Sequence, residues 1–271
     1  MTPKEAEQLF TQVLKEFGVL LDFKIINSRE SAQFRWGIVL LPSFYLKKPA
    51  NILKQLLRHE VGHRVIFPGK PDWEKLTMII AARKGVTDTE NFANVVADLF
   101  VDYELLRKYG QEFYERVIDA AKNYRGKDPR LWFMLSVYQL IAEDLGLKTP
   151  NYMESAKRFS INPELVISKA KKTLEILKSN ATLEGKIEQL AELLKDLFHA
   201  MFRKSFDDKL RAHGKLPNLS KLGPVIPAPE FMVQNDRRNP VRDPQWLSPV
   251  SYTHLRAHET SLHLVCRLLL E

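Results

Sequence analysis

The segment LLRHEVGHRVIF (residues 56–67) places His59, Glu60 and His63 in a stretch of residues that favour a helix. On an α-helix, residues four positions apart lie about 40° apart around the axis and about 6 Å along it. His59 and His63 would therefore share one face, with ring nitrogens able to reach a single metal ion. Glu60 would lie about 100° from His59, close enough to reach a water on that ion. The spacing indicates two metal ligands and one base.

Gly62, between the two histidines, favours a tightly packed site. A glycine inside a helix costs about 1 kcal/mol relative to alanine, so a structural requirement must offset it. We expect the backbone of a neighbouring helix, or the wall of a metal-bearing cleft, to approach closely here. The simpler interpretation of the segment is an amphipathic helix whose two histidines line a polar face.

A third ligand is needed, because a zinc hydrolase uses three protein ligands and keeps one position open. The segment NFANVVADLFVDYELLRKYG (91–110) is apolar nearly all round, which is typical of a buried helix. Asn94, Asp98 and Asp102 share one face of it, and buried polar groups need a metal or a hydrogen-bond network. We expect Asp98 to bind the metal and Asn94 or Asp102 to orient a histidine. Asp102 is the alternative third ligand, and a network satisfied by protein groups alone is the simpler interpretation.

The rest of the chain predicts a mainly α fold with a small β-sheet, that is, an α+β protein. Two segments rich in β-branched and aromatic residues, 20–28 and 33–43, are predicted strands. Helical spacing and the positions of Pro and Gly predict the helices. They span 3–17, 50–66, 72–85, 91–110, 112–124, 129–145, 162–179 and 183–212.

The order of strand, proline, histidine helix and acidic helix resembles the zincin metallopeptidases over about residues 20–108. NVVADLFVDYELL is similar to the A-x-D-x-x-x-N helix of predicted metal-dependent peptidases, some of which carry a von Willebrand-type domain. Asp98 stands at the family aspartate, Val96 replaces the alanine, and Asp102 replaces the asparagine. The resemblance implies a zincin-like catalytic core that holds Zn²⁺ through the two histidines and Asp98.

The function implied is a zinc-dependent metallopeptidase that cleaves peptide or protein substrates with a metal-activated water and Glu60 as general base. Two alternatives stay open. One is a non-catalytic helical interaction module in which the His-Glu-x-x-His helix is structural or a relic. The other is a zinc hydrolase that acts on bonds other than peptide bonds. The segment RWGIVLLPS (35–43) could bind an extended peptide as an added strand.

Four regions are expected along the chain. A zincin-like metallopeptidase core spans 1–125, a helical region 126–215, and a Pro-rich linker 216–247. Residues 248–271 contain the only cysteine and resemble translated sequencing-adapter sequence, so we interpret them as a non-native tail. The natural protein would then be longer, and its missing C-terminal part could carry a partner domain.

Composition narrows the partners and the compartment. Of the 271 residues, 45% are hydrophobic and 27% charged, which is typical of a globular protein. The formal net charge is +8, but the lysines and arginines are dispersed among Glu and Asp and form no basic run. No nucleic-acid partner is therefore expected. No uninterrupted apolar stretch is long enough to span a membrane, and the first residues lack the apolar core of a signal peptide. We therefore expect a cytoplasmic protein.

Overall fold

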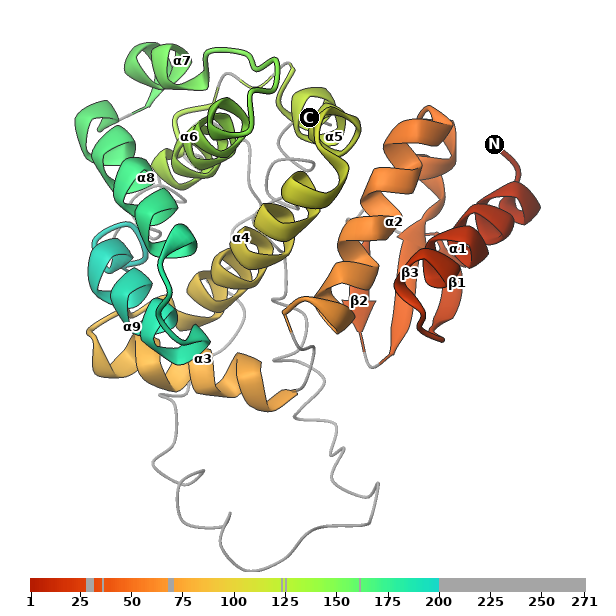
Figure 1. Ribbon diagram of the computed structural model, residues 1–271, viewed down its shortest axis with the longest axis horizontal. Helices are drawn as coiled ribbons and strands as arrows, with labels where there is room; N and C mark the ends of the chain where they lie inside the picture. Colours follow the sequence, from red (N-terminus) through yellow and green to blue (C-terminus); the bar gives the residue numbers. More distant parts are fainter. Residues whose placement is uncertain are drawn as a thin grey trace, which may run out of the picture. The chain divides into compact units, whose positions relative to one another are not determined.

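The computed structural model describes residues 1–199, except 28–31, 36, 68–70, 123, 125 and 161. The described part of the chain is mainly helical and has one small three-stranded sheet, which confirms the predicted fold class (Figure 1). The predicted linker at 216–247 and the predicted tail at 248–271 lie outside the described residues.

The helices and strands agree with most of the predicted positions. Along the chain they are α1 (Pro3–Phe17), β1 (Asp22–Ile26), β2 (Gln33–Arg35), β3 (Ile38–Pro42), the 3-10 helix η1 (Ser43–Lys47), α2 (Ala50–Val65), α3 (Pro71–Arg83), α4 (Thr89–Tyr109), α5 (Gln111–Ala121), α6 (Pro129–Asp144), α7 (Tyr152–Phe159), α8 (Pro163–Lys178) and α9 (Leu183–Leu194).

The sheet corrects two predictions. Residues 33–43, predicted as one strand, form the antiparallel pair β2 and β3, because Gly37 takes a left-handed φ of 82° where the chain reverses. Strand β3 is also parallel to β1, so it is the central strand of the order β1-β3-β2. The prediction that residues 35–43 receive a peptide as an added strand is therefore wrong for β3, whose two edges are already paired.

One hydrophobic cluster joins α1, the sheet and α2. Its ring contacts include the stacked pair Phe10 and Phe23, whose centroids lie 4.6 Å apart. Helix α2 contributes Leu53, Leu57 and Val61, which recur every fourth residue and so form one continuous stripe. This packing fixes the rotation of α2 about its axis and leaves the sector of the histidines free to face another helix.

That other helix is α4, which packs against α2, α3, α5, α6 and α9 (Figure 1). Its buried residues lie all round the helix, as the apolar sequence predicted, and they include the two aspartates Asp98 and Asp102. A second hydrophobic cluster surrounds α4 and extends through α9. Helix α4 is therefore held from several sides, and its acidic face is presented to α2 in a fixed orientation.

The C-terminal helices correct two further predictions. Helix α7 was not predicted; it is only eight residues long, and Asn151 caps it by accepting a hydrogen bond from the Glu154 backbone. The helix predicted over 183–212 ends at Leu194. Beyond it the chain turns so that Phe198 is buried against Phe92, with ring centroids 5.7 Å apart. Burial of this aromatic side chain outweighs the local preference for a continuing helix.

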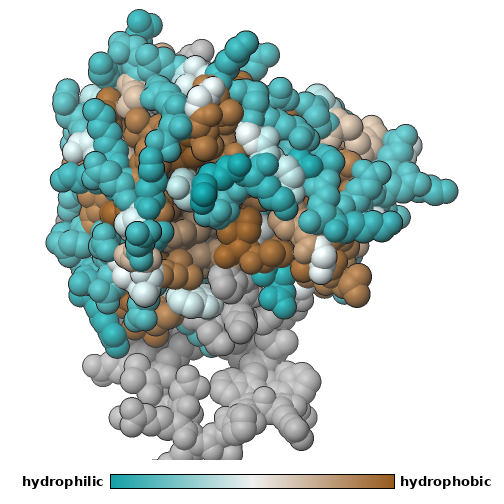
Figure 2. All heavy atoms as spheres, in the orientation of Figure 1, coloured by the Kyte–Doolittle hydropathy of each residue, from teal (hydrophilic) through white to brown (hydrophobic). Residues whose placement is uncertain are grey.

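Hydrophilic side chains cover most of the face shown in Figure 2, with hydrophobic areas between them. Among the described residues, the exposed large hydrophobic side chains lie at separate points of the fold: Met1, Leu20, Val65, Ile79 and Leu145. Isolated exposed apolar residues are ordinary on protein surfaces and indicate no docking face. None of the described helices combines the length and the apolar character that crossing a bilayer requires.

Side chains of α4 pack closely against Gly62, in place of the neighbouring backbone or metal-bearing cleft wall that the sequence led us to expect. A Cβ added there would lie 2.7 Å from Val101 Cγ1 and 3.3 Å from Leu105 Cδ1. We expect Gly62→Ala to lower the free energy of unfolding by about 1–3 kcal/mol, because overpacking outweighs the better helix propensity of alanine. Urea denaturation followed by circular dichroism measures the change.

The matched control is Gly185→Ala in the first turn of α9, where the nearest contact would be Thr182 Oγ1 at 3.3 Å. That variant should lose much less stability than Gly62→Ala, because its shortest Cβ contact is 3.3 Å rather than 2.7 Å. If Gly62→Ala unfolds at the original urea concentration, close contact between α2 and α4 at this point is wrong.

Candidate metal centre

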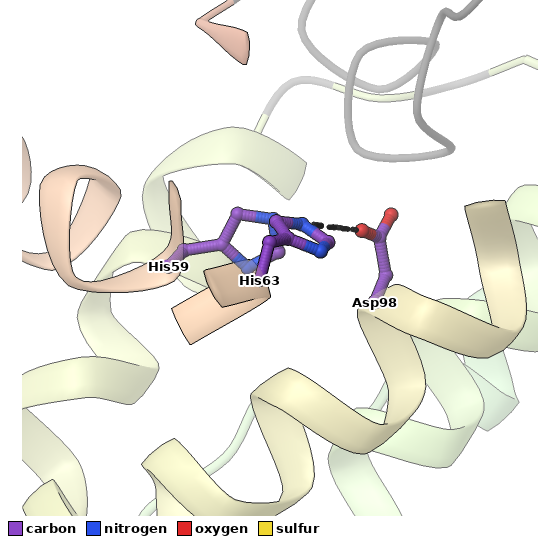
Figure 3. A group of neighbouring side chains, drawn as sticks. All are labelled: His59, His63 and Asp98. Carbon is purple, nitrogen blue, oxygen red and sulfur yellow. Dashed lines mark hydrogen bonds and ion pairs between the residues drawn. The ribbon is translucent and has the colours of Figure 1, made fainter. Parts of the chain in front are cut away.

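Helices α2 and α4 bring three side-chain donors together. The Nε2 atoms of His59 and His63 lie 3.2 Å apart, and Asp98 Oδ1 lies 3.5 Å from the first and 3.3 Å from the second. Figure 3 shows both imidazole rings turned towards the Asp98 carboxylate across the space between the helices. These three residues form a group that could hold a metal ion. The sequence predicted all three.

Asp102, one turn beyond Asp98 on α4, takes a different position. Its Oδ1 lies 2.6 Å from Nδ1 of His59, the ring nitrogen that faces away from the other histidine. A carboxylate at this nitrogen fixes the tautomer and the orientation of a ligand histidine. Asp102 therefore contacts His59 at the nitrogen that points away from His63, and Asp98 belongs to the group that could hold a metal ion.

The other two predicted site residues differ in placement. Glu60 is 2% exposed, and its carboxyl group is electrostatically coupled to both histidines and to Asp98. Asn94 is not as closely involved: its amide nitrogen is buried without a hydrogen-bond partner, and no hydrogen bond joins it to either histidine within the described residues. The orienting contact considered for Asn94 or Asp102 is made by Asp102.

Two residues next to the site were missed from the sequence. The Nη2 atom of Arg116, on α5, donates to both carboxylate oxygens of Asp102 at 2.8 Å, and Tyr138, on α6, is fully buried near the same carboxylate. A signal for Arg116 was present, because it lies on the buried stripe of α5 that includes Phe113 and Val117. A charged residue on an apolar stripe needs a buried partner. Tyr138 carries no such signal, because α6 is buried almost throughout.

Burial and charge act against each other in this cluster. Burial opposes protonation of His59, but the Asp102 carboxylate outweighs it and raises the pKa of His59 to about 10 in the metal-free protein. Burial would raise the pKa of Asp98, but contacts with His59 and His63 outweigh it and hold that pKa well below the usual range. The pKa of Glu60 is raised, chiefly by burial. The metal-free site therefore holds a proton on His59 between two carboxylates.

The balance of formal charges favours a divalent cation. Glu60, Asp98 and Asp102 are three buried carboxylates, and among the described residues the buried Arg116 forms an ion pair with Asp102. With the three carboxylates ionised, Arg116 and the protonated His59 leave one negative charge uncompensated, and two once a metal ion displaces the His59 proton. Burying such charge is costly unless a counter-ion is bound. A divalent ion among the three donors would make the cluster neutral.

Metal binding should release a proton at neutral pH. Because the pKa of His59 is raised to about 10 in the metal-free protein, an ion must displace a proton from this ring at any lower pH. We expect the apparent metal affinity to rise roughly tenfold per pH unit between about pH 7 and 9. The free energy of unfolding without metal changes with pH in the opposite direction to the metal affinity. Protonated His59 contributes fully to this stability below about pH 6.5, and the contribution is lost as the pH rises towards 10.

Isothermal titration calorimetry in buffers of different ionisation enthalpy counts the released protons. A metal affinity that is constant across this pH range would contradict the coupling of His59 to Asp102.

Comparison with known proteins adds no relative to this picture. No protein-family model, no curated protein and no solved structure matches the chain.

Proposed function

We propose that this protein is a zinc-dependent metallopeptidase of the zincin type. The observation that carries the proposal is the triangle of His59 Nε2, His63 Nε2 and Asp98 Oδ1, with edges of 3.2, 3.3 and 3.5 Å. Tetrahedral zinc with bonds of about 2.0–2.1 Å separates its ligands by about 3.3 Å. An octahedral ion with bonds of the same length separates neighbouring ligands by only about 2.9 Å. The observed edges fit the tetrahedral case better.

The number and kind of donors support a catalytic site over a structural one. Structural zinc sites are closed by four protein ligands, whereas catalytic sites use three and leave a position for water or substrate. The described residues supply three donors, two imidazoles and one carboxylate. Calcium and magnesium prefer oxygen donors, so two imidazole nitrogens argue against them. His63 is the most exposed of the three, with 13% of its side chain accessible, so we infer that substrate approaches from its side.

Glu60 is the residue to which we assign proton transfer. When bound, zinc would supply Lewis acidity to a water and to the substrate carbonyl. Glu60 follows His59 directly on α2, and its buried carboxyl group serves neither as the proposed ligand nor as the orienting group. It would take the proton from the attacking water and deliver it to the leaving amine. Its raised pKa suits both steps, because a catalytic acid or base works best near the operating pH.

The buried charge also bears on the alternative of a non-catalytic interaction module. Such a module would gain nothing from three carboxylates held around two histidines, because each buried charge costs stability unless it is compensated. A metal ion offers that compensation and, with the position left open, gives the cluster a chemical use. Peptide bonds are the proposed target because a glutamate beside the two histidines is the arrangement of metallopeptidases.

The test uses the full chain, purified and analysed for metal, and then incubated with a fluorescently labelled unfolded protein. We expect close to one zinc per chain and hydrolysis that a chelator stops and added zinc restores. Mass spectrometry of the products should show new N-termini, which identifies peptide-bond cleavage. Bound zinc without new termini would support a hydrolase of other bonds, and absence of metal and hydrolysis together would favour the interaction module.

A further inference from the structure

A buried arginine lies behind the more deeply buried histidine of the proposed zinc site. Arg116 is 3% exposed, and its Nη2 lies 2.8 Å from each carboxylate oxygen of Asp102. Asp102 Oδ1 is in turn 2.6 Å from Nδ1 of His59. Helices α5, α4 and α2 thus contribute one residue each to a continuous line of contacts. The line ends at the His59 Nε2 atom that faces Asp98.

The side chain of Arg116 has one hydrogen-bond partner among the described residues. Among the described residues, Arg116 donates to Asp102 alone, and its Nε and Nη1 atoms are buried without partners. Its guanidinium carbon lies 4.7 Å from the centroid of the Phe113 ring, and this stacking sets the plane of the group. A buried arginine with two unsatisfied nitrogens is costly, so retaining it requires a compensating role.

That role follows from what Asp102 would do without it. An aspartate side chain can rotate about two bonds, and a single contact to a histidine nitrogen leaves both rotations open. The contact from Arg116 reaches both carboxylate oxygens, including the Oδ1 that contacts His59, so it restricts rotation of the carboxylate. With the carboxylate held, the His59 ring has one preferred orientation. Without it, the ring could turn and move Nε2 out of the triangle of donors.

We propose that Arg116 is a positioning residue for the metal centre: it holds the Asp102 carboxylate so that His59 presents Nε2 to the ion. The inference rests on the proposed zinc site and identifies a determinant of its metal affinity. It places a third helix, α5, in the support of a site whose ligands come from α2 and α4. The hydrogen bonds of Arg116 go to Asp102, and its charge also acts on His59 and Asp98 at longer range.

The test is a double-mutant cycle on zinc affinity, measured in the full chain by competition with a chromophoric chelator of known affinity. Arg116→Met and Asp102→Asn should each weaken zinc binding by about 10–100-fold, the usual loss when a residue that supports a metal ligand is removed. The double variant should bind zinc no more weakly than Asp102→Asn alone, because the positioning effect of Arg116 passes through its hydrogen bonds to Asp102. Arg116→Lys, which keeps the charge but reaches one oxygen, should recover part of the affinity.

Arg130→Met is the matched control. Arg130 is also buried, at 6% exposure, and also pairs with an aspartate, since its Nη2 lies 2.8 Å from Asp128 Oδ2. It lies at the start of α6, where its guanidinium pairs with Asp128 and Asp88. Loss of Arg130 should lower the melting temperature and leave zinc affinity unchanged. This separates a general effect of removing a buried arginine from a specific effect on the metal.

Three results would overturn the inference. The first is unchanged zinc affinity in Arg116→Met, and the second is a double variant whose loss equals the product of the two single losses. The third is an equal loss of affinity in the Arg130 control. If the original protein binds no zinc, the proposed function falls and this inference with it, which is a different result from the other three. If Arg116→Met does not fold, Arg116→Lys and its double variant with Asp102→Asn form the cycle.

Discussion

Glu60→Gln is expected to reduce the rate of peptide hydrolysis by roughly 10²–10⁴-fold while the zinc content stays near one ion per chain. Glutamine has the size and shape of glutamate but cannot accept the proton of the attacking water. Glu60 is not among the three grouped donors, so its replacement leaves the metal in place. Because the side chain is 2% exposed, the neutral amide also removes a buried charge, and the variant should fold.

The measurement is kcat on a labelled unfolded protein, together with metal analysis of the same sample. Glu104→Gln is the control, because Glu104 lies on α4, is exposed, and pairs only with Arg107 among the described residues. It should keep full activity. If Glu60→Gln hydrolyses the substrate at the original rate, Glu60 is not the base, and the proposed mechanism is wrong even if zinc is bound.

Asp98→Asn is expected to weaken zinc binding by roughly 10²–10³-fold and to abolish hydrolysis at ordinary zinc concentrations. Zinc sites with four ligands bind with about 10–16 kcal/mol, so one ligand contributes about 2.5–4 kcal/mol, which corresponds to roughly 10²–10³-fold in affinity. Asparagine keeps the shape of the side chain but offers a neutral oxygen. It would also leave His59 and His63 without the carboxylate that both ring nitrogens face.

Asp102→Asn provides the comparison that separates a ligand from an orienting residue. It should weaken zinc binding less, by about 10–100-fold, and keep measurable activity when zinc is in excess. A thermal shift on adding zinc reports binding independently of activity, because a ligand that binds only the folded state raises the melting temperature. A larger loss in Asp102→Asn than in Asp98→Asn would reverse the roles assigned to the two aspartates.

Much of the metal centre could be predicted because its residues lie close together in sequence on two regular helices. The positions of His59, Glu60 and His63 on α2 follow from helical geometry alone. The placement of Asp98 needed one further step: a helix that is apolar on all sides must be buried, so its aspartates must face a partner. The structure brings Asp98 to both histidines in agreement with that reasoning.

Other features could not be predicted because they depend on contacts between distant segments. The division between Asp98 and Asp102 depends on the position of α4 along α2, where Val101 and Leu105 pack near Gly62. The end of α9 at Leu194 depends on the burial of Phe198 beside a helix that begins about 110 residues earlier. Local propensity contains no information about either contact.

The amino-acid sequence by itself determined that the protein is mainly helical with a small sheet, and that two imidazoles and a nearby acid share one helix. Those properties are local, because they depend on the periodicity of helices and strands within short stretches. Only the tertiary structure decided that Asp98 faces the Nε2 atoms of both histidines, that Asp102 contacts Nδ1 of His59, and that Arg116 donates to Asp102. These contacts follow from how three helices pack, and packing is determined by side chains from the whole core rather than by the site residues.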